Sequence, residues 1–133
     1  FNAQTQGMEP GLPVPVVIDH MGLAQAGQGP AQRGLAALGD LLASGRGWVK
    51  LSGAYRVSVQ EPGFADAAAI IRALIVANPD RCVWGTDWPH TNIEGYMPDD
   101  GELLDQLGTW VEDAAMLDKI LVDNPARLYK FSA

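Results

Sequence analysis

Three short apolar runs, each followed by a polar loop and a helical segment, constrain the fold of this chain more than any other feature. The runs are rich in β-branched and aromatic residues and cover 14–19, 48–52 and 81–86. Such runs are typical of strands. Strands that alternate with helices need crossover connections, so we expect the three strands to be parallel in an α/β fold.

Leucine and isoleucine recur at helical spacing between and after these runs. The predicted helices cover about 30–45, 64–77, 101–110 and 113–122. The segment NPARLY follows the last of them. Asn124 and Pro125 are expected to be the N-cap and first helical position of a short terminal turn, where these residue types are favoured.

The second predicted strand distinguishes a barrel from an open sheet. Val49 and Leu51 share one face, so Trp48, Lys50 and Ser52 share the other. Helices cover both faces of an open doubly wound sheet and would bury Lys50, whereas a barrel lets that face point to the interior. The barrel is preferred, but a (β/α)₈ TIM barrel needs eight strands and roughly 250 residues. The 133 residues are therefore expected to be the C-terminal portion of a single barrel domain.

Composition narrows the classes of partner. The net charge is −7 and no Lys/Arg cluster is visible, which argues against binding nucleic acid or an anionic membrane. No stretch approaches the about 18 apolar residues of a membrane span. Cys82 is the single cysteine and cannot form an internal disulfide, so we expect a cytoplasmic protein. The expected partner is a small carboxylated molecule, with a homo-oligomer as a further possibility.

Two residues at strand ends are candidates for catalysis. His20 follows the first strand, and Asp87 follows the third within WGTDWPH. Either residue alone is more often structural. Together at the same edge of a parallel sheet, they can activate water and polarise a carbonyl, or can bind a divalent metal such as zinc. The cofactor prediction is therefore none or one divalent metal.

Three further residues are candidates for binding substrate. Tyr55 and Arg56 follow the second strand, and an arginine there can hold a carboxylate with two hydrogen bonds. The alternative for Arg56 is a salt bridge to an acidic loop residue. His90 can contact Asp87 or the substrate, or can be a surface loop histidine. Lys50 is expected to be a buried structural partner of a carboxylate.

Four motifs, VVIDHMG, WVKLSGAYRVS, DRCVWGTDWPH and ILVDNPARLYKF, together resemble the amidohydrolase-related (amidohydrolase 2) family. Its best-known members are the 2-pyrone-4,6-dicarboxylate lactonases. The resemblance extends from Pro13 to near the end and corresponds to the C-terminal half of the family. It implies a (β/α)₈ barrel in which the three predicted strands are the sixth, seventh and eighth.

The resemblance also implies roles for the candidate residues. Asp87 would take the proton of the hydrolytic water, His20 would lie at the substrate carbonyl, and Arg56 would contact a substrate carboxylate. The family's first-strand His-x-His is absent from this chain. Leu23 stands where the family has an arginine that helps to hold a carboxylate, which argues against a pyrone dicarboxylate as the substrate.

The leading hypothesis is a hydrolase of a small carboxylated lactone or related cyclic ester. One alternative is a zinc-dependent amidohydrolase or decarboxylase of the same superfamily. A second alternative is an incomplete, inactive barrel that acts in binding or assembly.

Overall fold

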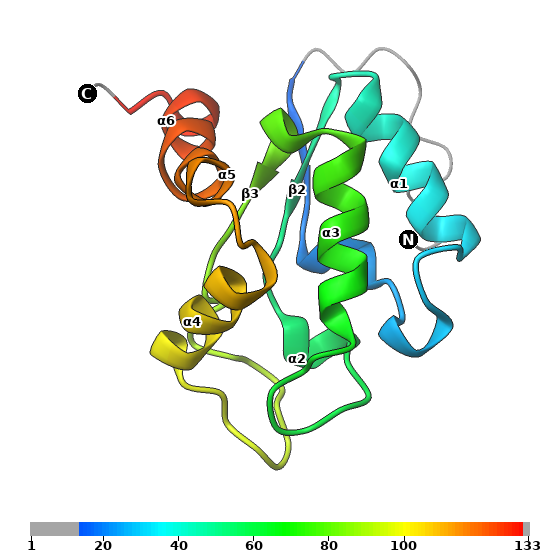
Figure 1. Cartoon of the computed structure of the whole chain (residues 1–133), viewed down its shortest axis with the longest axis vertical. Coiled ribbons are helices and arrows are strands. Elements are labelled where there is room, and N and C mark those ends of the chain that lie inside the picture. The colour runs from blue at the N-terminus through cyan, green and yellow to red at the C-terminus, as the bar shows by residue number, and fades with distance from the viewer. Residues whose placement is uncertain (1–13, 132–133) are drawn as a thin grey trace.

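The computed structural model describes residues 14–131, which form an α/β fold around a three-stranded parallel sheet (Figure 1). The strands are β1 (Val16–Ile18), β2 (Gly47–Lys50) and β3 (Cys82–Val83), in the order β1-β2-β3. β1 pairs with β2, and β2 pairs with β3, both in parallel. The predicted parallel arrangement is confirmed. The strands are shorter than predicted: β1 and β3 are shortened at both ends, and β2 ends at Lys50.

Helices connect and follow the strands. The longer ones are α1 (Arg33–Ala43), α3 (Ala67–Ala77) and α4 (Asp100–Trp110), close to the predicted segments. Shorter elements are α2 (Ala54–Val57), α5 (Ala114–Asp118), α6 (Asn124–Tyr129), the 3₁₀ turns η1 (His20–Leu23), η2 (Ala26–Gln28) and η3 (Pro79–Arg81), and the π-helical turn η4 (Lys119–Asp123). α2 lies in a segment for which a loop was predicted, because four residues are too few to show a helical period.

The core lies between the sheet and α1 and α3. Leu38 of α1, Ile70 of α3 and Val49 of β2 are each 0% exposed and belong to one apolar cluster. Full burial of each such side chain contributes about 1.5–3 kcal/mol. Val49 and Leu51 therefore face the helices, as the alternation in this strand predicted. Figure 1 shows α1 and α3 on one side of the strands and α5 and α6 on the other.

The other face of β2 is covered at one end. Trp48, predicted to share this face with Lys50 and Ser52, is only 3% exposed. The guanidinium carbon of Arg81 lies 4.8 Å from its ring centroid, and that of Arg127 lies 5.5 Å from it. α6, which carries Arg127, thus covers this end of the sheet, and the cation–π contact of Arg127 with Trp48 helps to hold it there.

The prediction that Lys50 is buried is wrong. Its side chain is 30% exposed. Its ammonium group lies 2.7 Å from Asp19 Oδ1, so the predicted carboxylate partner is present. This ion pair lies at the partly solvated end of β1 and β2, where a surface pair contributes little to stability.

The C-terminal helix is continuous from α5 through η4 to α6, and the predicted break at Asn124 is wrong. Asn124 has helical dihedral angles, with φ −66° and ψ −47°, so it cannot be an N-cap, which needs extended backbone. Its side chain is buried, and Nδ2 donates to the carbonyls of Pro79, at 2.8 Å, and Cys82, at 2.7 Å. Asn124 therefore ties this helix to the start of β3.

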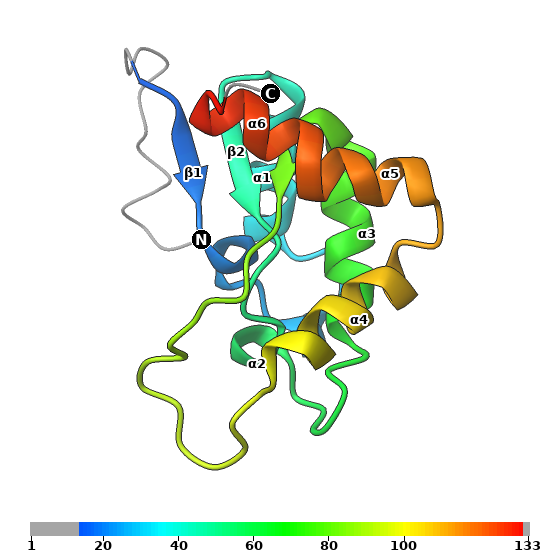
Figure 2. The same ribbon diagram turned by 90° about the vertical axis from the view of Figure 1, so that its left-hand side faces the viewer.

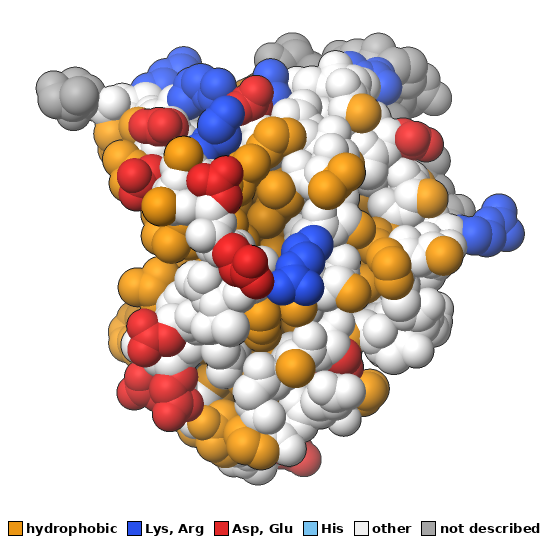
Figure 3. Space-filling view, viewed as in Figure 1, with side chains coloured by type: hydrophobic (Ala, Val, Ile, Leu, Met, Phe, Trp, Pro, Cys, Tyr) orange, Lys and Arg blue, Asp and Glu red, His pale blue; other side chains and the backbone are white. Residues whose placement is uncertain are grey.

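The carboxyl ends of the strands point toward α2 and the long loop between β3 and α4 (Figure 2). In parallel α/β folds this edge is where ligands bind. On the face drawn in Figure 3, acidic side chains gather over α4. Within residues 14–131, none of the helices combines the length and apolar character needed to cross a bilayer.

Candidate active site

His20 lies at the carboxyl end of β1, in the first position of η1. Its Nδ1 is 2.9 Å from Ser52 Oγ, and its Nε2 is 3.6 Å from Asp87 Oδ1. Gly53 makes this approach possible, because a Cβ there would lie 3.0 Å from His20 Nδ1 and the backbone has φ +65°. Glycine adopts this conformation without the steric cost of a side chain. The structure thus brings His20 and Asp87 together, as their places at strand ends predicted.

Asp87 lies after β3, with a side chain that is 17% exposed. Its Oδ2 accepts hydrogen bonds from Tyr55 Oη and Arg56 Nε, both at 2.5 Å. Its Oδ1 faces His20. The two oxygens therefore have different surroundings: Oδ2 is held by two donors from α2, and Oδ1 is open toward the histidine.

These contacts shift the pKa of both Asp87 and Tyr55. Burial raises the pKa of the Asp87 carboxyl, but hydrogen bonds from Tyr55 and Arg56 and the neighbouring His20 outweigh burial, so the net shift is downward. Burial and the adjacent Asp87 carboxylate raise the pKa of the Tyr55 hydroxyl. Asp87 is therefore ionised near neutral pH, and Tyr55 keeps its proton.

Of the two alternatives for Arg56, the structure shows the salt bridge to an acidic loop residue, and that residue is the catalytic candidate Asp87. Contact of Arg56 with a substrate carboxylate stays a prediction. One further hydrogen bond leads from Arg56 Nη2 to the carbonyl of Thr91, at 3.0 Å. The short helix α2 presents Tyr55 and Arg56 together toward the end of β3.

His90 is buried, with 6% exposure, so the alternative of a surface loop histidine is wrong, and its contact with substrate stays a prediction. Its Nδ1 lies 2.9 Å from Tyr55 Oη, and its Nε2 lies 2.9 Å from Asp100 Oδ1. Neither Asp100 nor the contact of Ser52 with His20 was predicted from the sequence. A carboxylate ten residues after His90, at the start of a helix, gives no local signal of this contact.

Three residues of the site have left-handed backbone conformations. The φ angles are 50° for His20, 66° for Asp87 and 55° for His90. Sparsely populated conformations of this kind cost about 1–3 kcal/mol each and occur preferentially at functional sites. The surrounding fold holds three polar side chains in place at this cost.

The residues do not by themselves fit a metal site. Within the part of the chain that the structure describes, no group of three His, Cys, Asp or Glu side chains could hold a metal ion. His20 and Asp87 would be two ligands, but the Arg56 guanidinium already neutralises Asp87 and occupies Oδ2. A cation placed beside this guanidinium would be repelled.

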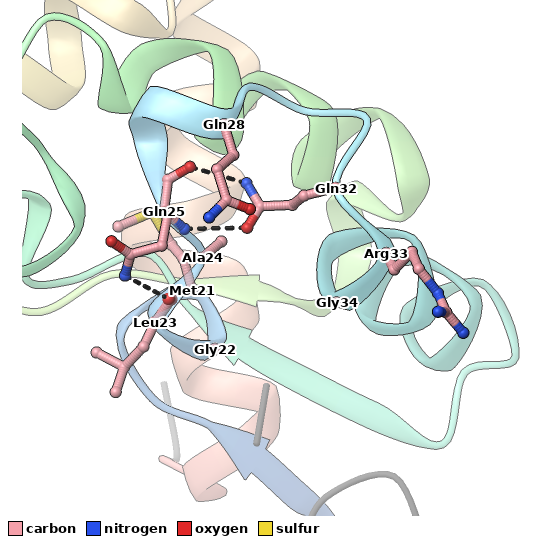
Figure 4. Close-up of a pocket in the computed structure, with 9 residues that line it drawn as sticks. All are labelled: Met21, Gly22, Leu23, Ala24, Gln25, Gln28, Gln32, Arg33 and Gly34. Carbon is pink, nitrogen blue, oxygen red and sulfur yellow. Dashed lines mark hydrogen bonds between the residues drawn. The ribbon is translucent and has the colours of Figure 1, made fainter. Parts of the chain in front are cut away.

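A hollow of about 380 Å³ lies beside η1 (Figure 4). Its lining comes from η1, the following turn and the start of α1, and Gln25 and Gln32 close one side. Gln25 N donates to Gln32 Oε1 at 3.0 Å, and Gln32 Nε2 donates to the Gln25 carbonyl at 2.9 Å. Leu23 is 53% exposed at its edge. Arg33, the one cation of this lining, lies at the opposite side in Figure 4 and does not replace a charge at Leu23.

A sequence profile described as Amidohydrolase matches residues 10–131. The chain belongs to the amidohydrolase family. The resemblance that the four motifs indicated is thereby confirmed.

Named relatives in this family act on lactones. The chain is 41% identical over 124 residues to the 4-sulfomuconolactone hydrolase of Rhizobium radiobacter, covering 90% of this chain and 40% of that protein. It is 36% identical over 118 residues to the D-galactarolactone isomerase of Agrobacterium fabrum, covering 87% of this chain and 40% of that protein.

A solved structure supports the fold. A crystal structure from Pseudomonas putida, described as a candidate 2-pyrone-4,6-dicarboxylic acid hydrolase, matches with a TM-score of 0.78 and 33% identity. The match covers 91% of this chain and 45% of that one. The chain thus spans less than half the length of the proteins that it matches. Its three-stranded parallel sheet is consistent with a partial barrel.

Proposed function

We propose that this chain carries part of the active site of a hydrolase acting on a small carboxylated lactone or related cyclic ester. The observation that carries the proposal is the asymmetric environment of Asp87. Tyr55 and Arg56 occupy Oδ2, and Oδ1 faces His20 Nε2 at 3.6 Å. A carboxylate with one free oxygen beside an imidazole can accept a proton from water.

In the proposed reaction, water lies between Asp87 Oδ1 and the lactone carbonyl carbon. Asp87 accepts a proton as the water oxygen bonds to that carbon, and the carbonyl electron pair moves to its oxygen. If the Ser52 hydroxyl donates to His20 Nδ1, Nε2 carries the imidazole proton and donates a hydrogen bond to this oxygen. Return of the electron pair re-forms the carbonyl and breaks the ring C–O bond. Asp87 gives its proton to the departing ring oxygen, which becomes an alcohol or enol, and the new carboxylic acid releases its proton to solvent.

Arg56 can contact a substrate carboxylate without leaving Asp87. A guanidinium has five N–H donors, and the protein contacts described above use Nε and one N–H of Nη2. The remaining N–H groups can bind an anion. Leu23 supplies no charge for a second carboxylate, so we propose a substrate with fewer carboxylates than a pyrone dicarboxylate.

We further propose that β1, β2 and β3 are the sixth, seventh and eighth strands of a (β/α)₈ barrel. The order of the motifs and the coverage of 40% of the sulfomuconolactone hydrolase support this assignment. The remaining βα units would then complete the pocket around Asp87. The single buried Cys82 supports a reducing, cytoplasmic environment for the protein.

Lactone isomerisation is a second candidate function, favoured by the 36% identity to a galactarolactone isomerase. The same base and carbonyl-polarising histidine could move an ester bond without adding water. The Arg56 guanidinium at Asp87 Oδ2 does not favour zinc-dependent chemistry. An inactive role in assembly would be shown by the absence of turnover in the assay below.

A panel assay tests the proposal. The full-length gene product should open lactones that bear a carboxylate, with lower kcat/KM for analogues in which that group is a methyl ester. Turnover should survive dialysis against a chelator. Failure to open any carboxylated lactone, or loss of all turnover with metal removal, would refute the proposed mechanism.

A further inference from the structure

A hydrogen-bonded chain leads from Asp87 through Tyr55 and His90 to Asp100, the first residue of α4. Tyr55 Oη lies 2.5 Å from Asp87 Oδ2 and 2.9 Å from His90 Nδ1. His90 Nε2 lies 2.9 Å from Asp100 Oδ1. The Asp100 side chain is 42% exposed, whereas that of His90 is 5% exposed. The chain therefore runs from the candidate base to the surface.

The number of protons in this chain fixes its direction. Ionised carboxylates only accept hydrogen bonds, the Tyr55 hydroxyl has one proton, and a neutral imidazole has one N–H. Three contacts need three protons, and a neutral His90 leaves one contact without a proton. With both ring nitrogens protonated, His90 donates to Tyr55 Oη and to Asp100, and Tyr55 donates its proton to Asp87 at the shortest contact.

We propose that Asp100 is a positioning residue for Asp87: it holds His90 doubly protonated, so that Tyr55 donates its only proton to Asp87 Oδ2. Oδ2 is then saturated by Tyr55 and Arg56, and Oδ1 is the oxygen left to accept a proton from water. The role of Oδ1 rests on the proposed function. The protonation of His90 does not.

The surroundings of the ring are consistent with a charged His90. Tyr55 faces it from α2, with the ring centroids 5.4 Å apart, and Asp100 faces it from the start of α4. From its own loop, the Asp87 carbonyl accepts from His90 N at 2.8 Å. A buried imidazolium without a counter-ion would be costly, and Asp100 supplies that counter-ion.

Nuclear magnetic resonance of isotope-labelled histidine tests the protonation directly. The His90 signals are assigned by their loss in a His90→Gln variant. In the full-length gene product near neutral pH, both ring nitrogens of His90 should be protonated. Asp100→Asn should leave only one of the two ring nitrogens protonated.

The matched control is Asp99→Asn, which removes the same charge one residue away. Asp99 accepts from Gly101 N and Glu102 N as the cap of α4, and asparagine caps equally well. A neutral His90 in the wild type, or no change in Asp100→Asn, would overturn the proposal.

The pH profile tests the consequence for Asp87, whose neighbours are His20, Tyr55 and Arg56. Asp100→Asn should weaken the hydrogen bond from Tyr55 to Asp87 and so move the acid limb of the kcat/KM profile to higher pH. It should also lower kcat by about threefold to tenfold, which corresponds to the contribution of one hydrogen bond. KM should not change. Tyr55→Phe should move the limb in the same direction, and Asp99→Asn should not.

A lower melting temperature in Asp100→Asn with an unmoved acid limb would show a merely structural residue and refute the proposal. The two proposals fail separately. A doubly protonated His90 that depends on Asp100, in a protein that opens no carboxylated lactone, would support the hydrogen-bond chain and contradict the proposed function.

Discussion

Replacing Asp87 with asparagine should remove the base while keeping most of its contacts. The amide oxygen can take the place of Oδ2 and accept hydrogen bonds from Tyr55 and Arg56. In the wild type, Tyr55 Oη and Arg56 Nε each lie 2.5 Å from Oδ2. The amide nitrogen then takes the place of Oδ1 beside His20 and cannot accept a proton. The substitution therefore acts at Oδ1, the oxygen proposed to accept the proton from water.

Loss of a general base lowers turnover by about 10²–10⁴-fold, which corresponds to about 2.7–5.4 kcal/mol of transition-state stabilisation. The effect on folding should be smaller, because the amide oxygen keeps the hydrogen bonds from Tyr55 and Arg56. We therefore expect a fall in kcat with little change in KM or in melting temperature.

The assay compares Asp87→Asn with wild type and with Asp40→Asn, an exposed aspartate on α1. Initial rates of lactone opening and thermal melting are measured for the full-length gene product in each form. Near wild-type turnover in Asp87→Asn would refute the role of Asp87. A large fall in melting temperature would show that the variant reports on folding rather than on catalysis.

Three further predictions concern binding, stability and the chain alone. Arg56→Met should raise KM for a carboxylated substrate, because it removes an anion contact; unchanged KM with a lower melting temperature would make Arg56 structural. Asn124→Ala should lower the free energy of unfolding by about 1–3 kcal/mol, since two hydrogen bonds to backbone carbonyls are lost; denaturant unfolding with no change in midpoint would contradict this. Residues 1–133 alone should be inactive and should associate or aggregate, because β1 and β3, within the described residues, each pair only with β2; a monodisperse, active monomer would show that this expectation is wrong.

The sequence predicted the elements whose signals are local. Apolar runs marked the strands, and the alternation of Val49 and Leu51 indicated the face that the helices cover. Because parallel strands end at one edge, the positions of His20 and Asp87 were enough to predict that they meet. Their catalytic roles stay predictions.

Contacts between distant segments could not be predicted in the same way. Asp87 binds Tyr55 and Arg56 across more than thirty residues, and the helix that presents them has one turn. Asn124 resembled a cap because an Asn-Pro pair is a common helix start, but the buried carbonyls at β3 outweighed that local preference. The lining of the site depends on packing that no local pattern encodes.

Hydrolysis itself can be tested most directly with water labelled with heavy oxygen. The full-length gene product is incubated with a carboxylated lactone in this water, and the ring-opened product is analysed by mass spectrometry after a single turnover. We expect one labelled oxygen in the newly formed carboxylate, and loss of this labelled product in Asp87→Asn. A product without label, or a rearranged lactone of unchanged mass, would contradict it.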